Sequence, residues 1–401
     1  MIRRIFRAFD YRDFRLLWFG ACTSSIGTWM QKLAQSWLVL QISGSPFLLG
    51  LDAFLGDIPI FLFSLVGGVV ADRTDRRRML LGSQFVQMSS AFVLTGLIAF
   101  HLVKVWHILA LSFVSGFAQA FGGPSYQALV PSLVEPKDLP NAIALNSIQF
   151  NLARIIGPVL GGLALTQLGA AWCFGLNGVS FVAVIISLFM LKVGFVPAPG
   201  KESLLASMKQ GLGFIRRQAA MKSLVVMAFL LTALAIPLVV FLPVFARSVF
   251  GRGASTYTLF LSISGAGSVA GALVVAGLGE IRCMGRMALF MLIGLGTCMV
   301  GFSLSKSLPV SCVLLFLAGA AMIGVFSMLT SLAQLLTTDE MRGRVMSVYN
   351  VAFRGGMPFG SLVTGTLVPV LTAPVALAIN GVLLFAVGVY SLFVHRRVAS
   401  L

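Results

Sequence analysis

The sequence predicts an all-α integral membrane protein with twelve transmembrane helices in two pseudo-symmetric six-helix bundles. Three observations predict this fold. The chain has 401 residues, of which 58% are hydrophobic and only 10% charged, and its mean hydropathy of +0.98 is far above that of soluble domains. Its apolar runs are long enough to cross a hydrocarbon layer of about 30 Å, which takes a helix of about 20 residues. Lastly, a motif recurs after half the chain length.

Each predicted span is an apolar run bounded by polar or charged residues. The first run follows basic residues, as in a secretory signal, but it is too long and further spans follow it. We therefore expect it to remain as the first helix. In order, the runs predict helices at 14–41, 46–71, 77–100, 105–128, 141–167, 172–193, 221–246, 256–280, 284–304, 309–336, 344–371 and 373–395.

The basic residues predict the orientation. Of the 29 lysines and arginines, three lie inside spans and four at the ends on one side, namely Lys104, Arg247, Arg252 and Lys306. The rest lie at the opposite ends, and the positive-inside rule then makes both termini cytoplasmic. The polar connection 196–220 divides the chain into an N-terminal bundle (1–195) and a C-terminal bundle (221–401). We read this connection as a linker, although apolar residues at helical spacing in 204–217 also suit a helix on the membrane surface.

Composition and motifs exclude several function classes. The net charge of +17 lies in short loops without a basic helix interleaved with aromatics, so we expect no nucleic-acid partner. The five cysteines are scattered through apolar segments without a CxxC pair and predict neither a metal site nor disulfides. No phosphate-binding glycine loop with its lysine is present, so ATP is not the expected energy source. No catalytic grouping is present either, and we expect no enzyme and no cofactor.

An internal repeat supports the division into halves. The segment Asn151–Pro158, read NLARIIGP, is matched 200 positions later by Val351–Pro358, read VAFRGGMP. Both the arginine and the proline return. Residues 277–286 also resemble a worn copy of the charged turn that follows the second span. Repeats of this kind in transporters place the substrate path at the interface between the halves.

That charged turn, Gly67 to Arg78, reads GGVVADRTDRRR and must lie in water. An ordinary basic hairpin between spans also explains its charge. Its pattern Gly68-x-x-x-Asp72-Arg73-x-x-Arg76-Arg77 resembles the signature loop of the major facilitator superfamily, secondary transporters with two six-helix halves. Where that family usually has a glycine before the second arginine, this chain has Asp75. The resemblance implies a part in gating for Gly68, Asp72, Arg73, Arg76 and Arg77.

A second motif lies in the fifth span. Gly157-Pro158-x-x-Gly161-Gly162 resembles the antiporter motif of the proton-driven exporters in that superfamily, which implies efflux and a gating role for these four residues. Proline frees a carbonyl and glycines allow close packing, so the segment can act as a pivot, with ordinary small-residue packing as the alternative. The segments DFRLLW from Asp13, GTWMQ from Gly27 and WLVL from Trp37 resemble the branch containing the bacterial enterobactin exporter and macrolide-efflux carriers.

Charges inside spans are candidate site residues, because each costs about 2.5–3.5 kcal/mol at a helix centre unless it faces water or a partner. Arg154 and its repeat mate Arg354 lie near the midplane, and we expect them to face each other and line the substrate cavity. They either attract an anionic group or hold backbone carbonyls, with a purely structural role as the alternative. Uncharged candidates for the cavity are Gln31, Gln35, Gln119, Tyr126, Asn146, Asn151, Gln334 and Asn350.

Proton coupling is expected at Lys32 and Asp57, which lie at similar depths in the first two spans and can form a buried pair. Protonation of Asp57 would break that pair. Asp52 is a second acceptor, or it simply reaches external water. Relatives often have an acid near position 36, where this chain has Ser36.

We therefore expect a proton-driven exporter of a large amphipathic compound, such as a siderophore, a macrolide or another drug. It would act as a monomer in the bacterial inner membrane. Uptake of a small nutrient by the same fold and a non-transporting receptor or scaffold remain alternatives. Substrate identity is beyond the sequence.

Overall fold

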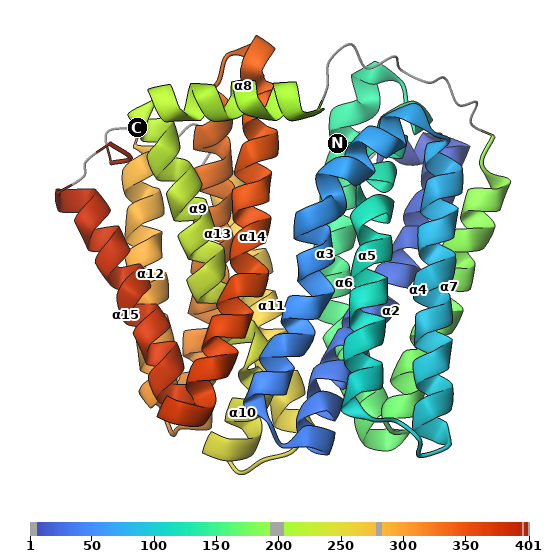
Figure 1. The fold of residues 1–401 in the computed structure, drawn as a ribbon, viewed down its shortest axis with the longest axis vertical. Coiled ribbons are helices and arrows are strands. Elements are labelled where there is room, and N and C mark those ends of the chain that lie inside the picture. Colours follow the sequence, from blue (N-terminus) through green and yellow to red (C-terminus); the bar gives the residue numbers. More distant parts are fainter. Residues whose placement is uncertain (1–5, 193–203, 278–282, 395–396, 400–401) are drawn as a thin grey trace. The chain divides into compact units, whose positions relative to one another are not determined.

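The structure is a computed structural model that describes residues 6–192, 204–277, 283–394 and 397–399. In this part of the chain the regular elements are all helices (Figure 1). Ten of them are long and apolar enough to cross a membrane. Two more, α2 (Arg12–Ser43) and α14 (Asp339–Leu371), are long enough at 32 and 33 residues but carry more polar side chains. The all-α transmembrane fold is confirmed.

Contacts between residues divide the chain into two compact units. Unit 1 consists of Met1–Ile42 and Ile58–Lys201, and unit 2 of Ser43–Asp57 and Glu202–Leu401. One boundary lies in the predicted connection 196–220, whose first part, 196–203, is outside the described residues. The other boundaries leave residues 43–57, including the start of α3 (Pro46–Arg73), with unit 2.

In unit 1, α4 packs against both α5 and α7. A core of buried apolar residues, including Phe14, Leu133 and Leu188, joins the first helix of the unit to its neighbours. Besides α2 and the second part of α3, the elements are η1 (Arg7–Asp10), α4 (Arg76–Ala99), α5 (Val105–Leu129), η2 (Val130–Leu133), η3 (Pro136–Asp138), α6 (Leu139–Gln167) and α7 (Ala170–Met190).

Unit 2 repeats this pairing, since α12 packs against both α13 and α15. The other close pairs are α11 with α13 and α9 with α14. Besides the start of α3, the elements are α8 (Leu204–Arg217), α9 (Ala219–Val240), α10 (Leu242–Val244), a π-helix η4 (Phe245–Val249), α11 (Ala254–Gly277), α12 (Met284–Leu304), α13 (Leu308–Leu335), α14 and α15 (Ala373–Phe393).

Most helix ends lie within three residues of the prediction, and two helices differ more for physical reasons, one by an interruption and one by its start. α9 ends at Val240, and after Phe241 the span predicted to end at 246 continues through α10, with Pro243 in its first turn, and η4 to Val249. A proline lacks the N–H that would continue the helical bonding. α14 begins at Asp339 rather than at 344, and Asp339 and Glu340 in its first turn suit the positive end of a helix dipole. Residues 277–286 were proposed as a degenerate copy of the charged turn, and 278–282 of this segment lie outside the described residues.

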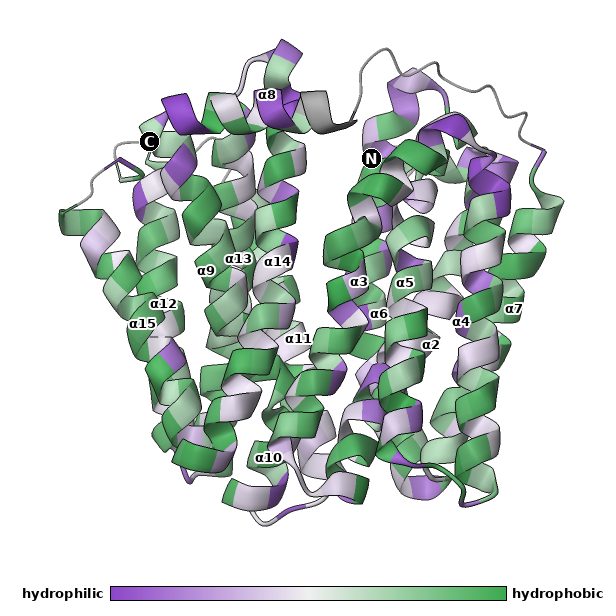
Figure 2. Cartoon of the chain, viewed as in Figure 1, coloured by the Kyte–Doolittle hydropathy of each residue, from purple (hydrophilic) through white to green (hydrophobic). Residues whose placement is uncertain are grey.

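Residues 204–217 form a helix, α8, that packs against α14 and α9. Figure 1 shows it running across the ends of these two helices. Figure 2 shows apolar residues along the spans, whereas hydrophilic residues gather on α8 and at the turn between α3 and α4. Mixed polarity along α8 and its position at helix ends favour a helix at the membrane surface.

Candidate functional site

The turn between α3 and α4 is built around Asp75. Its carboxylate accepts hydrogen bonds from the backbone N–H groups of Arg77, at 2.9 Å, and Arg78, at 3.3 Å. The side chain of Arg78 also lies 3.3 Å from the carboxylate. An aspartate in this position satisfies N–H groups that the first turn of a helix leaves unpaired. The residue that departs from the family pattern is therefore the N-cap of α4.

Arg76 joins this turn to two helix ends. Its Nη1 donates to the carbonyl of Ala128 at the end of α5, at 3.0 Å, and its Nε to the carbonyl of Ala71, at 3.3 Å. Its Nη2 lies 3.4 Å from Asp72. Helix C-termini present unpaired carbonyls and attract cations. Arg76 is thus held by helix ends together with its predicted gating partner.

Arg77 makes a similar contact on the other side of α4. Its Nη2 donates to the carbonyl of Phe189 in the last turn of α7, at 2.9 Å. The turn is therefore anchored to α5 and α7 within unit 1. The gating roles of Gly68, Asp72, Arg73, Arg76 and Arg77 stay predictions.

The second motif lies where α6 packs against α2. A Cβ on Gly157 would come within 2.8 Å of the carbonyl oxygen of Ile26, and one on Gly161 within 3.0 Å of the Cα of Met30. Any side chain at these positions would push the two helices apart. α6 runs without a break through Pro158. The glycines thus serve close helix packing, and the pivot role of Gly157, Pro158, Gly161 and Gly162 stays a prediction.

The two cations inside the spans of unit 1 share one aromatic ring. The Nζ of Lys32 lies 5.3 Å from the centroid of the Trp29 ring, and the guanidinium carbon of Arg154 lies 5.9 Å from it. Phe150 meets the same ring edge-on, with centroids 6.1 Å apart. Both cations are within the distance at which an aromatic face attracts a positive charge. We call Trp29, Lys32, Arg154 and Phe150 the cation cluster.

The cation cluster lies deep along its helices. Lys32 is about 16 Å from the end of α2, and Arg154 about 20 Å from the end of α6, at about 1.5 Å per residue. Lys32 is exposed and Arg154 partly exposed in the isolated chain. Placing such charges among lipid acyl chains costs free energy. This cost favours a position of the cluster in contact with water.

Unit 2 contains the other charges predicted inside the spans. Asp57, on α3, and Arg354, on α14, attract each other electrostatically. Asp52 lies a turn and a half earlier on α3 and is buried, with 6% of its surface exposed. Asp57 was predicted to pair with Lys32, which belongs to unit 1. That pair, the proton-coupling roles of all three residues and the facing of Arg154 and Arg354 stay predictions.

Several of the predicted polar residues make hydrogen bonds between helices. Gln31 accepts from the Nδ2 of Asn177 on α7 at 2.6 Å, and Gln35 donates to the hydroxyl of Ser112 on α5 at 2.8 Å. Gln119 accepts from Gln87 on α4 at 3.2 Å. These bonds show how the side chains are oriented, and their roles in a substrate cavity stay predictions.

The remaining polar candidates differ in their surroundings. The hydroxyl of Tyr126 lies 3.1 Å from the Oδ1 of Asn146, and Asn151 donates to the carbonyl of Ser147 in its own helix at 2.8 Å. Asn350 and Gln334 are exposed. Their contributions to substrate binding stay predictions.

Sequence reasoning missed four residues at or near these sites. Trp29 and Phe150 precede Lys32 and Arg154 by three and four positions, a helical spacing that could have found them. Asn177 is a buried amide in an apolar run. Gln149, also buried, donates to the hydroxyl of Ser25 at 2.7 Å. A buried amide in such a run needs a hydrogen-bond partner, which could have marked both.

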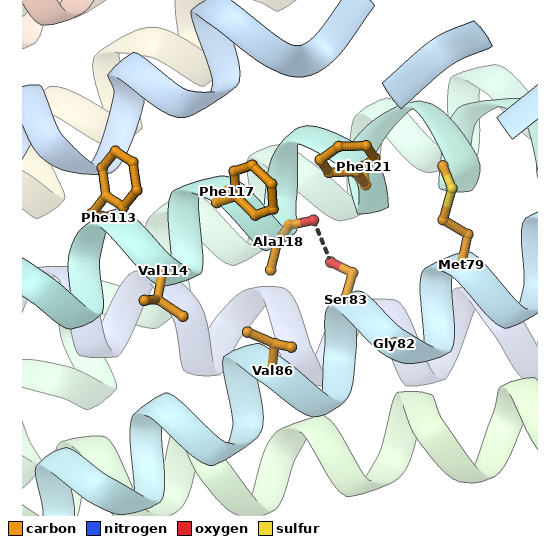
Figure 3. A pocket seen from close by; sticks show the side chains of 9 residues that line it. All are labelled: Met79, Gly82, Ser83, Val86, Phe113, Val114, Phe117, Ala118 and Phe121. Carbon is orange, nitrogen blue, oxygen red and sulfur yellow. Dashed lines mark hydrogen bonds between the residues drawn. The ribbon is translucent and has the colours of Figure 1, made fainter. Parts of the chain in front are cut away.

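A groove between α4 and α5 has a volume of about 530 Å³ (Figure 3). One polar side chain, that of Ser83, lines this groove, and its hydroxyl already donates to the carbonyl of Ala118 at 2.8 Å. It contains none of the predicted site residues and no group able to orient a polar ligand. Its lining residues are Met79, Gly82, Ser83, Val86, Phe113, Val114, Phe117, Ala118 and Phe121. We therefore place the candidate site at the cation cluster instead.

The sequence matches relatives along nearly its whole length. It is 22% identical to the staphyloferrin A transporter of Staphylococcus aureus, covering 93% of this chain and 94% of the relative. It is 26% identical to the multidrug efflux pump Tap of Mycolicibacterium fortuitum, covering 88% of each. It is also 24% identical to the enterobactin exporter EntS of Escherichia coli O1:K1, covering 95% of this chain and 91% of the relative.

The fold matches solved structures of transporters. A bacterial homologue of the human lysosomal transporter Spinster superimposes with a TM-score of 0.73 at 14% identity, covering 96% of this chain and 95% of the other. The model of the family described as transmembrane secretion effector matches residues 5–400. The chain belongs to this family of the major facilitator superfamily and is a multi-pass membrane transporter, not an enzyme.

Proposed function

We propose that this transporter exports a large amphipathic compound, such as a siderophore, a macrolide or another drug, by proton antiport and alternating access. The observation that supports it best is the pair of cations, Lys32 and Arg154, deep in the spans of unit 1. Ionisable groups at such depth mark substrate and ion pathways, because a lipid environment costs them too much. The names of the relatives, an efflux pump and a siderophore exporter among them, favour export.

The proton gradient supplies the energy, and no cofactor takes part. Asp57 and Asp52 are the acids inside the spans that can accept the coupling proton. A proton on Asp57 cancels its attraction to Arg354 and would also cancel a pairing with Lys32. Loss of such an attraction changes the relative free energies of two conformations, which is what coupling requires.

The protein acts in the bacterial inner membrane as a monomer, with both termini in the cytoplasm and no nucleic-acid partner. The orientation follows from the concentration of lysine and arginine at one set of helix ends. Among these are the arginines of the α3–α4 turn, which the gating hypothesis places at the cytoplasmic end of the pathway.

The proposal is tested with a deletion strain grown against a panel of siderophores and antibiotics, with exported siderophore measured in the medium. We expect greater sensitivity to at least one compound or less siderophore in the medium, and recovery of both when the gene is restored. A strain that accumulates less of a nutrient instead favours uptake. No change for any compound favours a receptor or scaffold.

A further inference from the structure

We propose that Trp29, Lys32 and Arg154 bind an acidic group, so that the exported compound is an organic anion with an apolar or aromatic body. This inference rests on the proposed function and narrows its substrate class. The structure gives the two cations a common position on one ring, which the sequence did not indicate.

The positive charges of the cation cluster are not balanced within unit 1. None of the ion pairs in the described part of unit 1 includes Lys32 or Arg154. The acids of this unit lie at helix ends or in connections, namely Asp10, Asp13, Asp72, Asp75, Glu135 and Asp138. The cation cluster therefore carries two positive charges without a carboxylate of its own unit beside them.

The charges of Lys32 and Arg154 also lie near each other. Their separation cannot exceed the sum of their distances from the Trp29 centroid, about 11 Å. Two like charges this close repel each other in a medium less polar than water. An anion between them, or two acidic groups of one molecule, would replace that repulsion by attraction.

Lys32 and Arg154 also bring many hydrogen-bond donors to the cation cluster. An ammonium group has three N–H donors and a guanidinium group five, with no acceptor. The indole ring of Trp29 attracts the two charges, but it can accept hydrogen bonds from few of these N–H groups. In the described part of unit 1, neither side chain is engaged by a backbone carbonyl, as a structural arginine holding helices together would be. Their donors suit carboxylate oxygens, which a guanidinium can bind in a two-point arrangement.

The ring side chains indicate what surrounds the acid. Phe150 is 54% exposed and lies edge-on to Trp29, so apolar aromatic surface adjoins the cations. This combination suits an acid attached to an aromatic or apolar body. A basic, positively charged drug would be repelled by the same cluster.

The first test needs no knowledge of the substrate. In the purified full-length protein, tryptophan fluorescence is quenched with iodide, caesium and neutral acrylamide at constant ionic strength. The contribution of Trp29 is the difference from the Trp29→Phe variant. We expect the ratio of iodide to caesium quenching of this contribution to be at least about threefold higher than the ratio for free tryptophan, because the cations concentrate anions around the ring.

Variants separate charge from structure in this test. Lys32→Gln and Arg154→Gln are expected to weaken iodide quenching of Trp29 and strengthen caesium quenching, with acrylamide unchanged. Lys306→Gln and Arg252→Gln remove exposed cations outside the spans and serve as matched controls without effect. An iodide-to-caesium ratio in the unaltered protein equal to that of free tryptophan, or parallel changes for all three quenchers in the variants, would overturn the proposal.

The second test uses an acid and its neutral amide. Binding of 2-naphthoate and 2-naphthamide to the protein in lipid nanodiscs is measured by calorimetry, with empty nanodiscs subtracted. We expect the acid to bind at least about tenfold more tightly than the amide, and Lys32→Gln or Arg154→Gln to remove most of this preference. Equal binding of the pair, binding of neither, or a preference that survives both substitutions together contradicts the anion site.

These results are independent of the proposed export. Export of basic or neutral compounds that is insensitive to Lys32→Gln and Arg154→Gln would leave the exporter in place and refute the anion site. Conversely, charge-dependent quenching and binding with no export of any compound would retain the anion site and refute the exporter.

Discussion

At the residue scale, the coupling hypothesis depends on one carboxylate. Asp57 lies inside a span and acts electrostatically on Arg354. The variant Asp57→Asn keeps the shape of the side chain but can neither hold a negative charge nor take up a proton. We expect it to abolish efflux driven by a pH gradient while expression stays unchanged, measured in everted membrane vesicles.

Two further carboxylates serve as references for this experiment. Asp339→Asn alters an exposed acid at the start of α14 and should leave efflux unchanged. Asp52→Asn tests the second candidate acceptor. Normal efflux by Asp57→Asn would remove Asp57 from the mechanism and leave Asp52 as the remaining acid inside the spans.

A second residue-scale prediction concerns the cap of α4. Asp75→Ala removes an N-cap carboxylate, which costs about 1 kcal/mol, whereas glycine in its place costs only a few tenths. We expect hydrogen exchange of the amides of Arg77 and Arg78 to become about fivefold faster in Asp75→Ala and to change little in Asp75→Gly. Unaltered exchange in Asp75→Ala would show that the observed bonds do not hold the turn.

Single residues also show what could and could not be predicted from the sequence. Lys32 and Arg154 were identified as deep charges because a charge in an apolar run is conspicuous. Their common ring was missed, since an aromatic residue in a membrane helix is usually explained by lipid contact. The role of Asp75 was missed as well, because the comparison with the family pattern made it a departure rather than a cap.

At the scale of elements, α3 is the helix that both units share. Up to Asp57 it belongs to unit 2, and from Ile58 to unit 1. Phe54 meets Phe359 of α14 edge-on with centroids 6.1 Å apart. Pro59 lies two residues after Asp57 and cannot donate to the carbonyl four residues earlier, so the helix is weakened close to the point where it passes from one unit to the other.

Gly50 is the test of the contact between α3 and α14. A Cβ there would lie 2.6 Å from the carbonyl oxygen of Ser361 and 3.0 Å from the Cα of Gly365, whereas one on Gly56 would meet nothing within 4 Å. We expect Gly50→Ala to lower the free energy of unfolding by about 1–3 kcal/mol and Gly56→Ala to leave it equal or raise it slightly. Steric trapping or thermal unfolding in detergent measures both. Equal stabilities would refute the close approach.

α8 offers a similar comparison. A Cβ on Gly211 would lie 2.5 Å from the carbonyl oxygen of Arg344 on α14, and Ile215, one turn later, is buried. We expect Gly211→Leu to detach α8 and to speed tryptic cleavage after Lys209, Arg216 and Arg217 about tenfold. Gly213→Leu, at a position with open space, is the control. Equal cleavage of the two variants would contradict the docking of α8.

The elements themselves could largely be predicted, because apolar length specifies a membrane helix and charged residues mark its ends. The break after Val240 could not be predicted, because the run 221–246 is apolar throughout. Its prolines gave no signal either, since intact helices such as α6 also contain proline. The sharing of α3 was equally hidden. Its apolar residues continue on both sides of Asp57, and only tertiary contacts distinguish the parts.

At the scale of the whole molecule, the repeat of 200 residues and the charged turn predicted the fold and the superfamily. The two units bear this out in their internal packing, since α4 contacts α5 and α7 as α12 contacts α13 and α15. The substrate and the energy source cannot be predicted from the sequence in the same way as the fold. We propose that they depend on a few side chains brought together by folding, such as Lys32 and Arg154 beside Trp29, and the apolar pattern of the helices does not indicate them.

The most direct test of the whole account is transport by everted vesicles from cells that overproduce the protein. A panel of siderophores and antibiotics is offered, accumulation is measured by mass spectrometry, and a protonophore is added to half of the samples. Proton-driven export predicts that at least one compound accumulates, that the protonophore abolishes the accumulation, and that Asp57→Asn vesicles lack it. Accumulation that persists with the protonophore, or that occurs only in right-side-out vesicles, would contradict it.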